Sequence, residues 1–325
     1  MEELTQPYCL KILKNKLFTF SIIFIFILFI ILITYNIFIR NNVKSGFILD
    51  IPKNSNLSSI ANILENNNIT YSKFFPFFTA KFLNYDKKLS YGEYLINEND
   101  TLFDILIKIK NGDVYERKFI LIEGFEYYHL NNLLESTNMS INHRDFKNYN
   151  IVADTFSYSK YQSTDSFLQG INNFTEDLFS DYLNSDILKE FTMKEIIIIS
   201  SLVEKEANND DDRKMISSVI YNRLRKGMKL DIDATVIFSI TKGMYKFDRS
   251  LNYEDLKIPS EYNTYLNKGL PPYPISFPGT QTIKIVLEDH DSPYYFYFFD
   301  TNKNSHIFSK DYKEHLTKLN EYRSR

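Results

Sequence analysis

The sequence predicts an α+β protein that is attached to a membrane by a single N-terminal helix. Three observations support this: an uncharged apolar run near the N-terminus, short apolar strands that alternate with amphipathic helices, and a pair of consecutive helices in the second half. With 325 residues the chain is long enough for two modest domains. Its net charge of −3 gives no basic excess, so we expect no nucleic acid among its partners.

The apolar run near the N-terminus is the predicted membrane helix. Residues 17–39 carry no charge, and a helix of this length spans roughly 34 Å, enough for a hydrocarbon core of about 30 Å. A cleaved signal peptide has an apolar region of only about 7–15 residues and a small-residue cleavage site, which TYNIFIRNNVKSG does not offer. We therefore expect an uncleaved, single-pass anchor that follows a cytoplasmic tail at residues 1–16.

The positive charges on the two sides of this helix are nearly balanced, so they do not decide its orientation. They are Lys11, Lys14 and Lys16 before the helix, and Arg40, Lys44 and Lys53 after it. We expect the C-terminal part to lie outside the cytoplasm, because long domains are translocated largely regardless of charge. The only cysteine, Cys9, precedes the anchor, so the predicted external part has no disulfide.

A small α+β module is expected at residues 48–114. A short strand and a Pro-Lys-Asn turn precede its first helix, and an aromatic helix follows at FFPFFTAKFLN. A strand is predicted at residues 94–96, and the last helix is capped by Asp100 or Thr101 and ends at Gly112. The apolar stripe of the first helix has helical spacing: Leu57, Ile60, Ala61 and Leu64.

The rest of the chain is predicted to contain a second strand–turn–helix unit and a larger domain. The strand–turn–helix unit covers residues 116–136, and the polar stretch 137–160 is expected to be a hinge or an irregular connection. We therefore divide the external part into the small module at 40–115, the second unit with its connection at 116–165, and a mixed α+β domain at 166–325.

Two consecutive helices in the larger domain have clear boundaries. Thr192 and Glu195 are spaced as a capping box, which predicts a helix over residues 193–207. The asparagines at residues 208–209 are typical of a left-handed exit, and one of the three aspartates that follow is expected to cap the next helix. That helix ends at Gly227 and forms a tight hairpin with the first.

Two glutamates lie at the inner end of this predicted hairpin. Glu204 and Glu206 are two positions apart and point about 200° from each other, so we expect one to face neighbouring structure and the other solvent. Glu204 continues an apolar stripe one turn beyond Ser200, where lost hydration would raise its pKa from about 4.3 to about 6–7, as a general acid requires. The ordinary alternative is a solvated helix terminus.

Several ordered motifs carry a resemblance to a known family. The more specific motifs are SLVEKEANNDDDR, SSVIYNRLRKGMKLDIDATVIF, YNTYLNKGLPPYPISFPG, YYFYFFD and HIFSKDYKEH. Weaker motifs precede them in the same order: DIPKNSNLSSIANIL, LSYGEYLI, LIEGFEYYHL and ADTFSY. Through these motifs the chain resembles the YceG-like family of endolytic murein transglycosylases over nearly its whole length after the predicted anchor.

The resemblance implies a single-pass protein of the inner membrane, with a LysM-like module and a catalytic domain in the periplasm. The implied reaction cleaves glycan strands of peptidoglycan between N-acetylmuramic acid and N-acetylglucosamine, leaves 1,6-anhydro ends and terminates growing strands. It needs no cofactor or metal. By this likeness Glu204, the first glutamate of EKE, is the catalytic acid. The implied partners are glycan strands, the membrane, penicillin-binding proteins and other cell-wall synthases.

The resemblance also places Asn222, Asp233 and Thr235 near the cleft, where they would hydrogen-bond N-acetyl groups or order a loop. Tyr262, Asn263 and Thr264 are expected to line the sugar groove together with residues 269–272. For Asn222, packing inside the hairpin is an equal alternative. Residues 269–272 are expected to form a rigid loop that lines the sugar groove, because proline fixes φ. His306 and Ser309 are weaker candidates.

The chain departs from the family pattern at loop stiffeners and in the connecting region. Ala234, Ile122 and Ala153 replace proline, Tyr273 replaces glycine, and Asn148-Tyr149 replaces Glu-Gly. These departures favour one alternative from a different class, a non-catalytic, membrane-anchored scaffold that binds peptidoglycan. Other chemistries lack their motifs: the chain has no H-E-x-x-H, no G-x-x-x-x-G-K-[ST], and no S-D-N or K-T-G to accompany the SYSK at residues 157–160.

Overall fold

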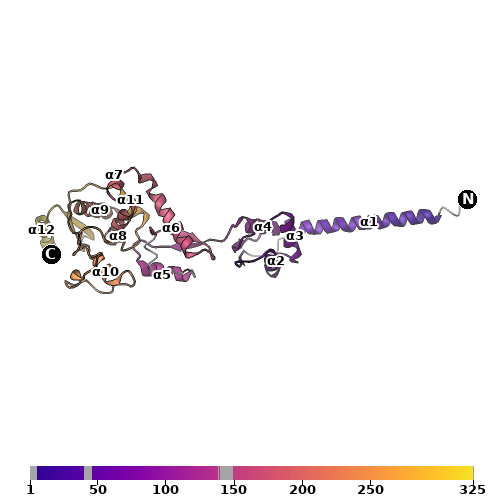
Figure 1. Cartoon of the computed structure of the whole chain (residues 1–325), viewed down its shortest axis with the longest axis horizontal. Helices are drawn as coiled ribbons and strands as arrows, with labels where there is room; N and C mark the ends of the chain where they lie inside the picture. Colours follow the sequence, from indigo (N-terminus) through magenta and orange to yellow (C-terminus); the bar gives the residue numbers. More distant parts are fainter. Residues whose placement is uncertain (1–5, 40–45, 138, 140–148, 325) are drawn as a thin grey trace. The chain divides into compact units, whose positions relative to one another are not determined.

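The computed structural model of the chain describes residues 6–39, 46–137, 139 and 149–324 (Figure 1). It divides into two compact units. The smaller unit runs up to Arg117 and includes residues 159–161, and the larger unit comprises residues 118–158 and those from Gln162 onward. Both contain helices and strands, as the predicted α+β class requires.

The smaller unit begins with a long apolar helix. Helix α1 (Gln6–Thr34) continues into a short π-helix, η1 (Tyr35–Ile39). Between Phe18 and Phe38 the mean hydropathy is 2.8, and this is the one helix in the described part of the chain that is long and apolar enough to cross a membrane. Its length and composition fit either a membrane anchor or a signal sequence.

The remainder of the smaller unit has the predicted elements. In chain order they are β1 (Phe47–Ile51), α2 (Leu57–Asn66), α3 (Phe74–Phe82), β2 (Gly92–Ile96) and α4 (Leu102–Asn111). The two strands are antiparallel, with Leu49 opposite Tyr94. Thr101 forms a capping box at the start of α4, and Gly112 ends that helix in the left-handed conformation, with φ 75°. The stripe predicted on α2 is confirmed, since Ile60, Ala61 and Leu64 are buried.

The larger unit holds most of the helices. Its N-terminal elements are β3 (Arg117–Ile120), α5 (Tyr127–Ser136), β4 (Thr155–Tyr158), α6 (Thr164–Phe179), η3 (Ser180–Tyr182) and α7 (Asp186–Glu190). Then follow α8 (Met193–Glu206), α9 (Asp210–Arg225), α10 (Asp233–Thr241), η4 (Asp255–Lys257), α11 (Thr280–Leu287), β5 (Phe296–Asp300), β6 (Ser305–Ser309) and α12 (Tyr312–Arg323). β3 pairs with β4, and β5 and β6 form an antiparallel hairpin.

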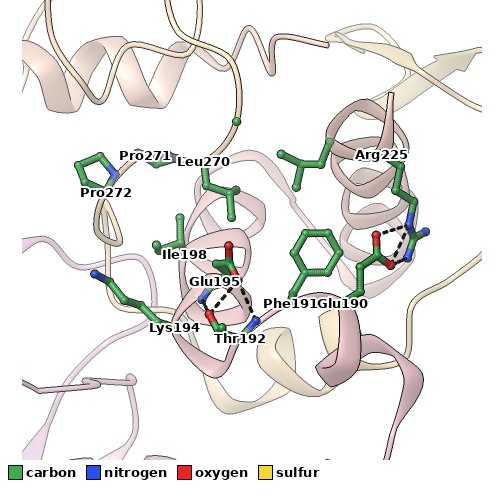
Figure 2. Close-up of a pocket in the computed structure, with 12 residues that line it drawn as sticks. Glu190, Phe191, Thr192, Lys194, Glu195, Ile198, Arg225, Leu270, Pro271 and Pro272 are labelled. Carbon is green, nitrogen blue, oxygen red and sulfur yellow. Dashed lines mark hydrogen bonds and ion pairs between the residues drawn. The ribbon is translucent and has the colours of Figure 1, made fainter. Parts of the chain in front are cut away.

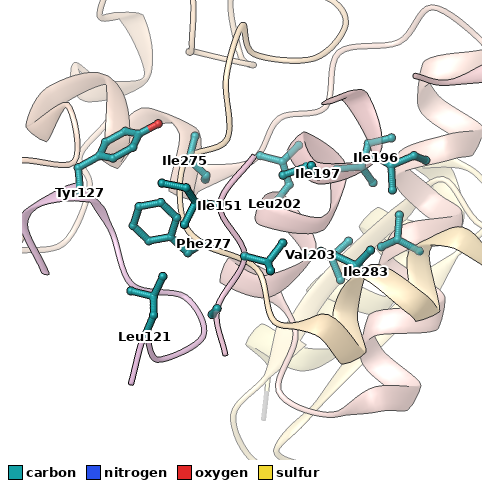
Figure 3. Packing of buried hydrophobic residues seen from close by; sticks show 14 of the residues in the cluster. Leu121, Tyr127, Ile151, Ile196, Ile197, Leu202, Val203, Ile275, Phe277 and Ile283 are labelled. Carbon is teal, nitrogen blue, oxygen red and sulfur yellow. The ribbon is translucent and has the colours of Figure 1, made fainter. Parts of the chain in front are cut away.

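Helix α8 is the centre of the larger unit. Every residue from Ile196 to Val203 is buried, and the helix packs against α9, α10 and α11. Figure 3 shows its side chains among apolar residues from distant parts of the sequence, including Leu121 and Phe277. A helix that is apolar on all sides belongs inside a core. Its C-terminal glutamates therefore end among packed elements, and the expectation that one of them faces solvent is wrong.

The predicted helical hairpin is present, but its turn differs from the expectation. Thr192 and Glu195 form the predicted capping box. Ala207 leaves α8 in an extended conformation, with φ −84° and ψ 145°, so the left-handed exit predicted at residues 208–209 is wrong. The cap of α9 is Asn209, whose side chain accepts the N–H of Asp212. One asparagine caps the helix, and the aspartates expected to do so occupy its first turn instead.

The connection predicted after residue 136 is only partly irregular. Residues 138 and 140–148 lie outside the described residues. Within the described remainder, residues 155–158 form β4, which pairs with β3. The partner strand is distant in sequence, and only four residues take part, so no local pattern indicated this strand.

Candidate active site

Glu204 is held by donors on three different segments. One carboxyl oxygen accepts from Arg213 at 3.0 Å, and the other accepts from the Gly279 amide at 2.9 Å and the Thr282 hydroxyl at 2.6 Å. Only 4 % of the side chain is exposed. Gly279 is the N-cap residue of α11, where a negative charge is favourable. These polar partners differ from the apolar environment that the sequence predicted for Glu204.

Glu206 points to the opposite side of α8 and has a different environment. It lines a cavity of about 330 Å³, and Glu204 is not among the residues that line this cavity. Burial, and after it the negative charge of Asp233, raise the pKa of Glu206 from 4.5 to about 7. The Tyr297 hydroxyl, 3.2 Å from the carboxyl, and the Ala234 amide act in the other direction because they favour the ionised form. Glu206 thus has the protonation behaviour that was expected of Glu204.

The first turn of α10 forms the wall of the cavity beside Glu206. Asp233 lines the cavity and accepts a hydrogen bond from the Tyr265 hydroxyl at 2.6 Å. Ala234 is one of the positions where the family pattern has proline. Its backbone N–H donates a hydrogen bond to the Glu206 carboxyl, which a proline could not do. This departure therefore adds a donor to the candidate acid.

Further lining residues of the cavity come from α9 and the β5–β6 hairpin. Arg223 donates to the carbonyls of Leu230 and Tyr295, each at 2.6 Å, which fixes a positive charge at the edge of the cavity. His306 lines the cavity, and its ring lies 3.0 Å from the Asp212 carboxyl. The cavity therefore combines carboxyl, phenol, imidazole and guanidinium groups, a set suited to hydrogen bonding a polar ligand.

Asp233 is the predicted binding residue that lines this cavity, and the other five have structural contacts. Thr235 and Thr264 are buried and lie 2.9 Å apart through their hydroxyls. Asn263 is fully buried and donates to two carbonyls of its own loop, at Leu256 and Ile258. The contacts given for these three residues are made within the protein, and none of the three lines the cavity.

Tyr262 and Asn222 also contact other parts of the protein. The ring of Tyr262 is buried and packs against Phe238, with 4.8 Å between ring centroids. Asn222 donates to the carbonyls of Ser292 at 2.8 Å and Tyr294 at 2.9 Å, and so ties α9 to the segment before β5. Of the weaker candidates, His306 lines the cavity, whereas Ser309 is fully buried within β6.

The loop at residues 269–272 lines a different cavity, of about 660 Å³, at the N-terminal end of α8 (Figure 2). Leu270, Pro271 and Pro272 face the capping residues Thr192 and Glu195 across it. Helix α8 has 14 residues and is about 21 Å long, so this loop and Glu206 belong to opposite ends of the helix.

Sequence reasoning did not select Glu206, Tyr265 and Tyr297, which also line the cavity of about 330 Å³. Glu206 was within the motif that carried the resemblance, and the tyrosines were within YNTYLNKG and YYFYFFD. The chain has 24 tyrosines, so tyrosine content alone could not select these two. Among the described residues no group of three or more His, Cys, Asp or Glu side chains could hold a metal ion.

Comparisons with known proteins agree with this architecture. A model of the YceG-like family matches residues 49–321. The endolytic murein transglycosylase of Bacillus subtilis is 29% identical over 315 residues, with 85% of each chain covered. The enzyme of the same name from Streptococcus pneumoniae is 27% identical over 164 residues, which are 50% of this chain and 29% of the pneumococcal one. The crystal structure of a YceG-like protein from Listeria monocytogenes superposes with a TM-score of 0.53 at 25% identity, covering 85% of this chain and 99% of that one.

Proposed function

Since the chain belongs to the YceG-like family, we propose that it is an endolytic murein transglycosylase. It cleaves within glycan strands of peptidoglycan, between N-acetylmuramic acid and N-acetylglucosamine, and leaves 1,6-anhydro ends. The observation that carries the chemistry is the cavity at the C-terminal end of α8, which Glu206 lines together with Asp233, Tyr265 and Tyr297. Burial, as the largest cause, raises the pKa of Glu206 to about 7. A group with that pKa can both give and accept a proton near neutral pH.

The acid proposed here is Glu206, and Glu204, which the resemblance implies, is the alternative acid. Glu206 lines a cavity that a sugar could enter, whereas both carboxyl oxygens of Glu204 are engaged by protein donors. Glu204 has a positioning role in this proposal: it joins α9, through Arg213, to the start of α11. The end of α8 from which Glu206 projects is thereby fixed.

The reaction needs one carboxyl group. Protonated Glu206 gives its proton to the glycosidic oxygen, and the bond from that oxygen to C1 of N-acetylmuramic acid breaks. The resulting carboxylate then takes the proton of the 6-hydroxyl of the same sugar as O6 forms a bond to C1. The leaving N-acetylglucosamine keeps the first proton, Glu206 regains one, and no water is consumed. Ordinary glycosidases need a second carboxyl because they activate water or form a covalent intermediate.

The cellular setting is proposed on the same basis. Helix α1 is the single-pass anchor in the inner membrane, the smaller unit after it is a LysM-like module, and the catalytic unit lies in the periplasm. The apolar segment Phe18–Phe38 and the β1–α2–α3–β2 order support this arrangement. There the enzyme would terminate growing glycan strands, together with penicillin-binding proteins and other cell-wall synthases.

The test is digestion of isolated sacculi by the full chain in detergent, with products identified by mass. Wild-type protein should release fragments with 1,6-anhydro ends, and Glu206→Gln should release at least about 100-fold less. Glu204→Gln is the matched control, because it makes the same replacement of a carboxyl by a carboxamide in the same turn of α8. At a temperature where circular dichroism shows it folded, Glu204→Gln should retain part of the activity.

Two results would count against the proposal. If Glu204→Gln is folded and inactive while Glu206→Gln is active, the acid is Glu204 after all. If the wild-type chain sediments with sacculi and releases no anhydro fragments, the protein is the non-catalytic scaffold, for which binding would survive both substitutions.

A further inference from the structure

Helix α3 in the smaller unit exposes a stripe of phenylalanines. Phe74, Phe78 and Phe82 are 61%, 62% and 87% exposed, and their spacing of four residues places them on one face of the helix. The opposite face carries the buried residues Pro76 and Ala80, and Thr79, also buried, lies between the two faces. Soluble proteins rarely leave three neighbouring aromatic side chains in water, so this face is expected to have a partner.

The stripe lies beside the C-terminal end of the apolar helix. A cavity of about 400 Å³ separates the two, and its lining residues are apolar apart from two threonines. They are Ile33, Thr34, Ile37 and Phe38 from α1 and η1, and Phe78, Thr79, Phe82 and Leu83 from α3 and its end. The hydroxyl of Thr34 bonds to the carbonyl of Ile30, which leaves its methyl group for the cavity.

The length of the apolar segment indicates at which level of a bilayer this cavity would lie. The segment Phe18–Phe38 has 21 residues and reaches about 31 Å as a helix, close to the thickness of the hydrocarbon core. If it crosses a bilayer, Ile33 to Phe38 lie where acyl chains meet headgroups. The face of α3 that shares their cavity lies at the same level.

We propose that α3 is an interfacial helix that lies in the surface of the membrane holding the anchor. This inference rests on the proposed anchoring of α1. Phe74, Phe78 and Phe82 enter the outer part of the acyl region, and an acyl chain fills the cavity against the anchor. The exposed lysines Lys73 and Lys81 extend toward the lipid phosphates.

A bilayer fits this surface better than a soluble protein does. One wall of the cavity is the span itself, so whatever fills the cavity must be compatible with hydrocarbon. Aromatic residues with lysines beside them are the composition found where helices lie at the membrane interface. A second copy of the chain is the competing occupant, and it is separated from lipid by the experiment below.

The absence of tryptophan from the sequence permits a direct test in the full chain. Three single-tryptophan variants are reconstituted into liposomes of phosphatidylcholine and phosphatidylglycerol: Phe78→Trp on α3, Phe26→Trp in the middle of the span, and Tyr253→Trp in the larger unit. Tyr253 is 72% exposed and serves as the aqueous control. Fluorescence quenching is compared between lipids brominated near the headgroup and lipids brominated near the chain end.

We expect Phe78→Trp to lose most of its emission to the shallow bromines, Phe26→Trp to the deep bromines, and Tyr253→Trp to neither. Adding Phe74→Ser and Phe82→Ser to Phe78→Trp should reduce the quenching, because the helix loses apolar area that holds it in the lipid.

Three outcomes would overturn the inference. If Phe78→Trp behaves like Tyr253→Trp while Phe26→Trp is quenched, the anchor stands and α3 lies in water. If Phe26→Trp is not quenched, the anchoring fails and the inference fails with it. If Phe78→Trp is unquenched and its emission moves to shorter wavelength as the protein-to-lipid ratio rises, a second copy covers the stripe.

Discussion

The two sides of the last turn of α8 use the same chemical group in opposite ways. Glu204 has an arginine, an amide and a hydroxyl within 3.0 Å and opens on no part of the cavity at the C-terminal end of the helix. Glu206 has a phenol at 3.2 Å, the charge of Asp233 nearby and a raised pKa. A buried carboxyl with strong donors holds structure together, whereas a buried carboxyl with weak donors is available to react.

The largest expected effect is on stability and comes from breaking the ion pair between Glu204 and Arg213. Arg213→Met removes the cation from Glu204 and leaves a buried carboxylate with two neutral donors, which should lower the free energy of unfolding by about 4 kcal/mol. Urea unfolding at pH 7 measures this. Lys189→Met is the control, because it breaks an ion pair with an exposed aspartate and should leave the midpoint unchanged. A loss below about 1 kcal/mol for Arg213→Met would mean that the Glu204 ion pair does not hold the hairpin together.

On the side of Glu206, removing the ionisable group should raise the free energy of unfolding at alkaline pH. A folded-state pKa of about 7 against 4.5 means that the folded chain holds the Glu206 proton more tightly. Stability is therefore lost as pH rises through this window, by a total of about 3 kcal/mol. Glu206→Gln should match wild type near pH 4 and exceed it by up to about 3 kcal/mol near pH 8. Equal stability at both pH values would show that Glu206 is not buried in its protonated form.

The sequence was sufficient for the parts of this comparison that depend on neighbouring residues. The capping box at Thr192 and Glu195 and the apolar run after it determine α8, and both were predicted from spacing alone. The sequence could not show where the two glutamates point, because their partners Gly279 and Tyr297 are more than 70 residues away. The local stripe suggested Glu204, whereas the tertiary packing gives Glu206 the cavity.

The positions of Asn263 and Thr264 were also only partly predictable from the sequence. Asn263 and Thr264 were predicted to line the sugar groove, and they belong to the loop that carries Tyr265 to Asp233. Both side chains are turned into that loop, where they bond its backbone and the hydroxyl of Thr235. A motif shows that a residue type is required at a position, and only the packing shows whether it contacts a ligand or supports the residue that does.

Removing a hydrogen-bond donor of Glu206 should have a smaller effect, on the pH dependence of activity. Tyr297→Phe removes a hydroxyl that favours the ionised carboxyl, so the pKa of Glu206 should rise further. The loss of activity on the alkaline side should move to higher pH by about 0.7 of a unit, which corresponds to about 1 kcal/mol. The pH profile of anhydro-fragment release measures it. Tyr294→Phe, whose ring lies against Phe308, should leave the profile in place.

The smallest effect is expected at the far end of α8. Pro271→Ala should lower the free energy of unfolding by only about 0.5 kcal/mol, because alanine gives the unfolded chain more freedom. The cavity that Pro271 lines reaches along α8 only as far as Ile198, about 12 Å from Glu206 along the helix, so the rate of fragment release should not change. A fall in that rate without a matching loss of stability would show that the loop at residues 269–272 holds the glycan, as its family pattern first indicated. The comparison would then no longer be between the two sides of one turn, because the substrate would extend along the whole of α8.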